Sequence, residues 1–202
     1  MTTLYLVRHA VTADTGKRLT GWTQGVSLTD EGRVQARAVA AALAGVPFKG
    51  LYSSPIDRTL ETAKAIAEGH GLSVRTRRGL GEIDYGTWTD RPLKLLARTK
   101  LWQRVMSYPS GVRFPEGETL REAQTRAIDE IEKIHDEHPK GPVCCVSHGD
   151  VIKLVLAHYL GVHIDLYQRI VVAPASVSLI VLGPQGPRVW GVNVPANALE
   201  NV

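Results

Sequence analysis

Two histidines of this sequence stand one residue beyond a short apolar run. His9 follows Leu4–Val7 in this way, and His148 follows Val143–Val146. A neutral imidazole is a competent nucleophile toward phosphorus at neutral pH, provided that one ring nitrogen is held as a donor and the other presents its lone pair. His9 is therefore a candidate nucleophile for phosphoryl transfer.

Several basic or N–H-bearing groups could bind the phosphoryl group. Arg8 and Arg58 carry forked donors that could neutralise the phosphoryl oxygens as the transferring group becomes metaphosphate-like. His148 would add a donor if it were protonated. The backbone of Gly149 begins a predicted helix, whose free N–H groups form a natural anion site. Together these groups predict a phosphate pocket.

A proton donor is also needed. Glu82 could protonate the leaving alkoxide and later take a proton from water, if its pKa is raised enough to keep some of the acid form. Asp84 is the alternative carboxylate. No carboxylate cluster accompanies the histidines, as a magnesium or two-metal phosphatase would need. We therefore expect neither a metal nor another cofactor.

Strand-like apolar runs alternate with helical patterns through most of the chain. The predicted strands are 4–7, 51–52, 74–76 and 143–146, and the predicted helices are 30–44, 55–69, 93–106, 120–138 and 151–160. Segments 176–182 and 188–194 predict an antiparallel hairpin at a sheet edge. The alternation favours an α/β three-layer sandwich, with a mostly parallel sheet covered by helices on both faces. The carboxyl ends of parallel strands share one edge, so His9 and His148 are expected together there.

Two of the helices carry local predictions. Thr29 is expected to cap the first helix. The apolar stripe predicted for that helix is Val34, Ala38, Ala41 and Ala42. In the second helix, Ser54 is predicted as the N-cap, Pro55 as the first helical residue, and Asp57 as the partner that returns the capping bond.

The bulk composition is that of a globular protein. With 202 residues, of which 44% are hydrophobic and 22% charged, the chain fits one domain over residues 1–202. There is room for a small cap or insertion around residues 86–118, in which the Pro- and Gly-containing stretch 108–117 predicts a surface loop and part of a lid. Cys144 and Cys145 are adjacent in a predicted strand, so they are expected to be buried, reduced thiols rather than a disulfide.

The net charge of +4 favours anionic partners. The densest basic run, Arg75, Arg77 and Arg78, lacks interleaved aromatic residues and a nucleic-acid motif, so no nucleic-acid partner is expected. The sequence has no signal-peptide pattern and no stretch near the roughly 18 apolar residues of a membrane helix. We therefore expect a cytoplasmic protein with no membrane partner.

The chain resembles the histidine phosphatase superfamily, also called the phosphoglycerate-mutase-like family. Leu6–Ala10 resembles its nucleophile signature, and Gly21–Gly32 resembles the segment that follows. Ser53–Ala63 resembles the helix start that supplies a second phosphate-binding arginine, Glu82–Gly86 the acid-bearing loop, and Ser147–Gly149 the turn of the second histidine. The order and spacing match, and their joint occurrence is more specific than any single motif.

By this resemblance, His9 corresponds to the phosphorylated nucleophile and Glu82 to the proton donor. The phosphate pocket would comprise Arg8, Arg58 and His148. The resemblance also implies the phosphoglycerate-mutase-like version of the three-layer sandwich.

Other positions concern the rest of the substrate or depart from the family pattern. Thr15, Gly21 and Tyr85 are candidate substrate-binding residues, and Thr15 stands where the family often has asparagine. Ala10 and Asp90 replace glycines of the pattern. The backbone at Ala10 must therefore tolerate a Cβ, and Asp90 could make the mouth of the site more acidic.

The resemblance implies a metal-independent phosphatase that hydrolyses a small phosphomonoester through a phosphohistidine on His9. A phosphoglycerate mutase would return the phosphoryl group to a sugar acid instead of water, but this short chain lacks the longer insertion expected of the glycolytic mutases. A non-catalytic phosphate-binding module is a third alternative, because fold does not fix function. The substrate and the oligomeric state stay open.

Overall fold

One mixed sheet organises the protein, whose computed structural model describes residues 1–201. Its strands lie in the order β4-β3-β6-β1-β7-β8. They are β1 (Thr2–Arg8), β3 (Gly50–Ser53), β4 (Val74–Thr76), β6 (Gly141–Ser147), β7 (Val177–Leu182) and β8 (Arg188–Val194). The first four are parallel, whereas β7 is antiparallel to both β1 and β8. The predicted α/β fold, with its antiparallel edge hairpin, is confirmed.

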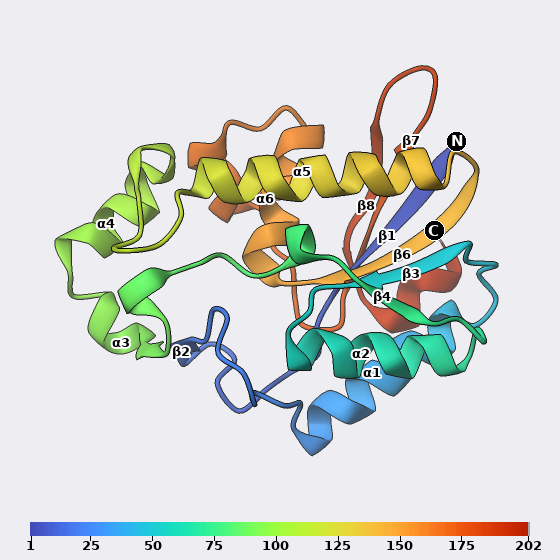
Figure 1. Ribbon diagram of the computed structural model, residues 1–202, viewed down its shortest axis with the longest axis horizontal. Coiled ribbons are helices and arrows are strands. Elements are labelled where there is room, and N and C mark those ends of the chain that lie inside the picture. The colour runs from blue at the N-terminus through green and yellow to red at the C-terminus, as the bar shows by residue number, and fades with distance from the viewer. Residues whose placement is uncertain (202) are drawn as a thin grey trace.

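Helices cover both faces of this sheet. Helices α1 (Asp30–Leu43) and α2 (Asp57–Glu68) lie on one face, and α5 (Leu120–Glu137) and α6 (Gly149–Tyr159) lie on the other (Figure 1). The central strands are therefore buried on both faces, which explains why their sequences are nearly continuous apolar runs.

The two faces bury separate hydrophobic cores. In β1, Leu6 packs in the core shared with α5 and α6, while Val7 packs in the core shared with α1 and α2. Cys145 and Cys144 of β6 divide between the two cores in the same way. Both cysteines are buried free thiols, as expected from their adjacent positions in a strand.

The register of β1 and β6 sets the position of the two histidines. These strands are parallel neighbours in which Arg8 lies opposite Ser147. One residue further on, the backbone N–H of His9 donates to the Ser147 carbonyl at 3.0 Å. His9 and His148 therefore leave the sheet side by side at its carboxyl edge.

Helix α1 confirms the predicted cap but buries a different face. The hydroxyl of Thr29 accepts the Gly32 N–H at 3.0 Å. The buried residues are Gly32, Ala36, Val39 and Leu43. The predicted stripe is wrong, since Val34 is 57% exposed. Alanine-rich helices carry small apolar residues on several faces, so spacing alone did not identify the buried one.

Helix α2 corrects the predicted capping. It begins at Asp57 and has no side-chain cap at Ile56. The Ser54 hydroxyl accepts the Ile56 N–H at 3.4 Å, and it also contacts the ring of His148, at 2.8 Å from Nε2. The Asp57 carboxylate accepts the Gly25 N–H at 2.6 Å and does not return a capping bond to Ser54. Ser54 and Asp57 therefore have their shorter contacts with residues distant in sequence.

The segment 86–118, for which a cap is predicted, lies to the left of the sheet in Figure 1. The single helix predicted over 93–106 is wrong, because α3 (Leu93–Leu96) and α4 (Lys100–Ser107) are separate. The hydroxyl of Thr99 starts α4 by accepting a backbone N–H at 3.1 Å.

Two short strands connect this segment to the loop after β1. They are β2 (Arg18–Leu19) and β5 (Arg91–Pro92), which pair antiparallel. The predicted loop 108–117 contains one 3-10 turn, Pro109–Gly111. None of the helices within residues 1–201 has both the length and the apolar character needed to cross a bilayer.

Candidate active site

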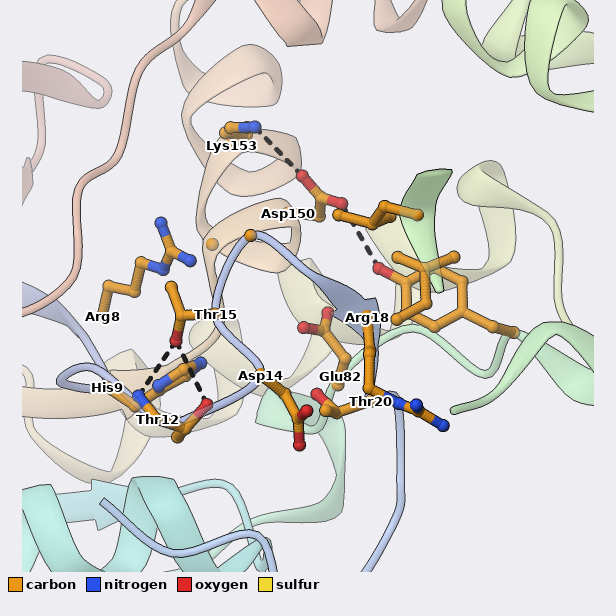
Figure 2. Close-up of a pocket in the computed structure, with 15 residues that line it drawn as sticks. Arg8, His9, Thr12, Asp14, Thr15, Arg18, Thr20, Glu82, Asp150 and Lys153 are labelled. Atoms are coloured by element: carbon orange, nitrogen blue, oxygen red, sulfur yellow. Dashed lines mark hydrogen bonds and ion pairs between the residues drawn. The ribbon is translucent and has the colours of Figure 1, made fainter. Parts of the chain in front are cut away.

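A pocket of about 190 Å³ opens at the carboxyl ends of β1 and β6 (Figure 2). The predicted site residues that line it are Arg8, His9, Thr15, Glu82, Tyr85 and Gly149. None of the described residues 108–117 lines this pocket, and a lid formed by them stays a prediction. Segment 86–118 contributes Leu93.

His9 has the geometry of a neutral nucleophile. Its Nδ1 lies 2.8 Å from the Ala10 carbonyl, which can only accept, so Nδ1 carries the proton and Nε2 keeps its lone pair. Burial, and next the charge of Arg58, lowers the pKa of His9 to about 3. The imidazole is therefore neutral at neutral pH, with its one proton on Nδ1.

Arg58 and His148 lie behind the pocket wall and are both fully buried. Arg58 Nη2 donates to the Gly21 carbonyl at 2.8 Å and to His148 Nδ1 at 3.2 Å. His148 Nε2 must then carry the proton, which it donates to the Ser54 hydroxyl. Burial and the Arg58 charge lower the pKa of His148 well below its ordinary value. His148 is thus neutral here, contrary to the protonated donor considered from sequence.

Both arginines keep buried N–H groups without a partner among the described residues. These groups are Arg8 Nε and Arg58 Nε and Nη1. Another donor of Arg8, Nη1, is used, since it reaches the Val172 carbonyl at 2.7 Å. An unpaired buried donor of a charged group is costly, so these atoms favour an anionic acceptor such as a phosphoryl group.

Glu82 is placed to hold or release a proton. Burial, and next the nearby Asp150, raises its pKa to about 7. Its Oε1 accepts the Ile83 N–H at 3.0 Å, and its Oε2 lies 3.7 Å from His148 Nδ1. At neutral pH the carboxyl group therefore populates both its acid and its base form.

Asp84 is directed elsewhere. Its Oδ1 accepts the Gly86 N–H at 2.9 Å, and the residue borders a different surface pocket, near Trp22. The alternative of Asp84 as the acid is therefore wrong for this pocket.

The candidate substrate-binding residues differ in position. Thr15 lines the pocket, but its hydroxyl accepts the Thr12 N–H at 2.9 Å. Tyr85 also lines it and donates its hydroxyl to Asp150 at 3.3 Å. Gly21 does not reach the wall and acts instead as the carbonyl partner of Arg58.

Ala10 and Asp90, which stand where the family pattern has glycine, differ in backbone conformation. Ala10 is fully buried and is not among the residues with positive φ, so its Cβ costs no backbone strain. Asp90 has a φ of +64°, the region that glycine enters most easily. Its carboxylate does not itself line the pocket but pairs with Arg18, which does, at 2.9 Å.

Sequence reasoning missed several charged residues of the wall: Asp14, Arg18, Asp150 and Lys153. Lys153 Nζ lies 3.1 Å from Asp150 Oδ1 and 3.4 Å from Gln168 Oε1. Figure 2 shows this lysine and aspartate paired on the helix behind the pocket. Their i, i+3 spacing just after His148 was a usable signal, because residues at this spacing share a helix face.

Among residues 1–199, no group of three or more histidine, cysteine, aspartate or glutamate side chains is arranged to hold a metal ion.

Comparisons with known proteins agree on one family. The sequence model of the histidine phosphatase superfamily (branch 1) matches residues 4–195. A relative named probable phosphoglycerate mutase GpmB, from Yersinia pestis (strain Pestoides F), is 30% identical over 183 residues, which cover 89% of this chain and 85% of the relative.

Solved structures show the same likeness. YhfR of Bacillus stearothermophilus superposes with a TM-score of 0.91 at 26% identity, covering 96% of this chain and 98% of that one. A phosphoserine phosphatase from Entamoeba histolytica, in complex with 3-phosphoglyceric acid, gives a TM-score of 0.86 at 26% identity, covering 96% and 97%.

Proposed function

The chain belongs to the histidine phosphatase superfamily, and we propose that it is a phosphatase that transfers the phosphoryl group of a small phosphomonoester to His9 and then to water. The observation that carries this proposal is the pairing of a neutral His9 with unpartnered N–H groups of Arg8 and Arg58. Both arginines lie close enough to His9 to lower its pKa. A nucleophile and an oxyanion-binding group therefore stand together.

In the first step, His9 Nε2 attacks phosphorus and the bond from phosphorus to the leaving oxygen breaks. The Glu82 carboxyl group passes its proton to that oxygen, so the alcohol leaves neutral. The hydrogen bond from His9 Nδ1 to Ala10 holds the ring in the reactive tautomer throughout. Arg8 and Arg58 neutralise the charge on the phosphoryl oxygens.

In the second step, the Glu82 carboxylate takes a proton from a water molecule. The water oxygen attacks phosphorus, the bond between phosphorus and Nε2 breaks, and its electron pair returns to His9. Inorganic phosphate leaves, and Glu82 regains its acid form. The pKa of about 7 suits both duties, since neither form is rare near neutral pH.

The proposed substrate is small and phosphorylated. The pocket of about 190 Å³ is below the roughly 300–1,000 Å³ typical of sites for drug-sized ligands. The Entamoeba histolytica relative was solved with phosphoserine and with 3-phosphoglyceric acid, each a compact phosphomonoester. We propose this size class for the substrate.

A mutase is the second candidate, because the Yersinia pestis relative bears a mutase name. It would use the same phosphohistidine and return the phosphoryl group to a sugar acid. We favour hydrolysis because the family resemblance gives the glycolytic mutases a longer insertion than this 202-residue chain has, and because a similar solved structure is named a phosphoserine phosphatase.

The test compares wild type, His9→Ala and the control His158→Ala, which removes an exposed histidine of α6. Phosphate release from p-nitrophenyl phosphate, phosphoserine and 3-phosphoglycerate is measured with EDTA present. We expect release by wild type and the control, and a loss of at least a thousandfold in His9→Ala. Interconversion of phosphoglycerates without phosphate release would instead identify a mutase, and binding without turnover would identify a non-catalytic module.

A further inference from the structure

The loop that carries Glu82 has little regular structure of its own. Residues 82–85 belong to no helix or strand, and the preceding 3-10 turn is Arg78–Leu80. Backbone carbonyls in such a loop have no ladder partners, so other groups must satisfy them. The position of the Glu82 side chain therefore depends on whatever holds these carbonyls.

Arg126 of α5 binds three backbone carbonyls, one in this loop and two in the turn that leads into it. Its Nη1 donates to the carbonyls of Gly79 and Gly81, each at 2.9 Å, and its Nη2 donates to the Glu82 carbonyl at 2.8 Å. Its Nε and Nη2 also bind the two carboxylate oxygens of Glu118, at 3.0 and 2.7 Å. A guanidinium has five N–H donors, and all five are used here.

The partners of Arg126 are themselves fixed. Glu118 Oε1 also accepts the Asp84 N–H at 2.8 Å, and the Glu118 N–H donates to the Asp84 carbonyl at 3.0 Å. The side chains of Arg126 and Glu118 are only 25% and 16% exposed. A bidentate pair shielded from water in this way holds its geometry better than an exposed ion pair.

The remaining contacts complete the attachment. Ser147 Oγ donates to the Leu80 carbonyl at 2.7 Å, and Trp22 Nε1 donates to the Glu82 carbonyl at 2.6 Å. Side chains thus hold all four consecutive carbonyls from residue 79 to residue 82. A Cβ at Gly81 would lie 2.3 Å from the Trp22 ring, so this close approach requires glycine.

From this geometry we infer that Arg126 is a positioning residue that, with Glu118, holds the general-acid loop so that Glu82 reaches the leaving oxygen. The inference rests on the proposed function, because it gives Glu82 the role of proton donor. Arg126 lies outside the pocket wall and does not touch the substrate site. Its loss should therefore impair proton transfer and leave phosphoryl binding largely intact.

The dependence of kcat/KM on the acidity of the leaving group distinguishes a loss of proton transfer from a loss of phosphoryl binding. Esters of strongly acidic phenols expel the leaving group without a proton, whereas esters of weakly acidic phenols need one. The experiment measures kcat/KM for a series of substituted phenyl phosphates, from p-nitrophenyl to p-methoxyphenyl. The variants are Arg126→Lys, which keeps the charge but not the fork, and Glu82→Gln as the reference without an acid.

The matched control is Arg113→Lys. Arg113 also binds a glutamate, Glu122 at 2.6 Å, and one carbonyl, Gly117 at 3.0 Å, but the pair is more than half exposed and does not contact the acid loop. We expect this variant to stay within about twofold of wild type for every ester, as is usual for an exposed pair.

For Arg126→Lys we expect a loss of about tenfold to a hundredfold with p-methoxyphenyl phosphate, the size of effect that a displacement near 1 Å produces. The loss with p-nitrophenyl phosphate should be under about threefold. Trp22→Phe, which removes one donor from the Glu82 carbonyl, should give a smaller change in the same direction. If Arg126→Lys does not fold, the dependence measured for Trp22→Phe decides the matter.

The inference is overturned if Arg126→Lys loses kcat/KM equally for all esters, or loses none. The proposed function still stands in that case if Glu82→Gln makes kcat/KM depend more steeply on the acidity of the leaving phenol. If Trp22→Phe has to decide, the inference is overturned when its dependence on the leaving phenol equals that of wild type. If Glu82→Gln itself shows no steepening, the proposed role of Glu82 fails, and the inference fails with it.

Discussion

Arg58 is fully buried and Arg8 is partly buried, and both keep N–H donors that no described residue satisfies. Arg58 is 0% exposed, yet Nε and Nη1 lack partners among the described residues. Burial lowers the pKa values of Arg8 and Arg58 from their ordinary range, which reports the cost of holding these charges out of water. Unpaired buried donors are unfavourable without an acceptor, so this arrangement supports the proposed binding of a phosphoryl group.

Inorganic phosphate should consequently stabilise the folded protein. At about 100 times its Kd, a ligand that binds only the native state contributes about 2.7 kcal/mol. For a chain of this length, that raises Tm by roughly 5–10 °C. Arg58→Lys should lose most of this shift because an ammonium cannot reproduce the fork. The exposed control Arg33→Lys should keep it, and an equal shift in all three proteins would contradict a phosphate site at Arg58.

The protonation of Glu82 predicts the alkaline side of the pH profile. Its pKa is raised to about 7, so the acid form is present below that value and is lost as pH rises through it. The pKa of His9, lowered to about 3, leaves the nucleophile neutral over the same range. We expect kcat/KM for phenyl phosphate to fall about tenfold per pH unit above pH 7.

Glu82→Gln tests this assignment directly. The variant has no titrating group at this position, so its kcat/KM should be lower and flat above pH 7. An unchanged alkaline limb in the variant would assign the ionisation to another group.

Local sequence signals were most reliable where a bond is made within one element. Thr29 caps α1 as predicted, because its partner lies three residues away. Ser54 has the residue type of a cap, but His148 competes for its hydroxyl from the neighbouring strand end. Residue propensity describes how well Ser54 suits a local helix cap, but it contains no information about a partner about ninety residues away in the sequence.

The turn at Gly86 gives a prediction about how the acid loop packs. Gly86 has a φ of +53°, and a Cβ there would lie 2.0 Å from the Pro115 carbonyl oxygen. Gly86→Ala should therefore cost strain and a steric clash together, roughly 3 kcal/mol or more. Gly71→Ala is the control, with a φ of +61° but no neighbour within 4 Å, and should cost about 1 kcal/mol. Urea unfolding gives the free energy of unfolding of both variants. Equal losses would contradict the predicted clash and show that the backbone at Pro115 moves aside at little cost.

Across the molecule, the sheet and its edge could be predicted, whereas part of the pocket wall could not. Continuous apolar runs identified β1 and β6, and parallel strands must end at a common edge, so His9 and His148 could be placed together. The wall also takes Asp14 from the loop after β1, Arg18 from the two-residue strand β2, and Leu93 from α3. A loop and a two-residue strand show no periodicity, so Asp14 and Arg18 could not be placed from the sequence.

The buried face could likewise be predicted for one helix but not for another. The buried face of α5 follows the predicted residues Leu120, Ala123, Ala127, Ile131 and Ile134, because large side chains mark one stripe. In α1, alanines on several faces left the choice to tertiary packing, and the prediction failed. Arg126 shares a helix with the well-predicted stripe, yet its contacts to residues 79–82 depend on how that loop crosses α5.

The central claim is that His9 carries the phosphoryl group between substrate and water, and the most direct measurement is rapid-quench trapping of the phosphoenzyme. Wild type and Glu82→Gln are mixed with ³²P-labelled p-nitrophenyl phosphate, quenched in base, and the labelled residue is located by mass spectrometry. We predict acid-labile, base-stable label on His9 only, with more of it in Glu82→Gln because water attack is slowed. Turnover of the ester with no label, or with label on another residue, would contradict the account.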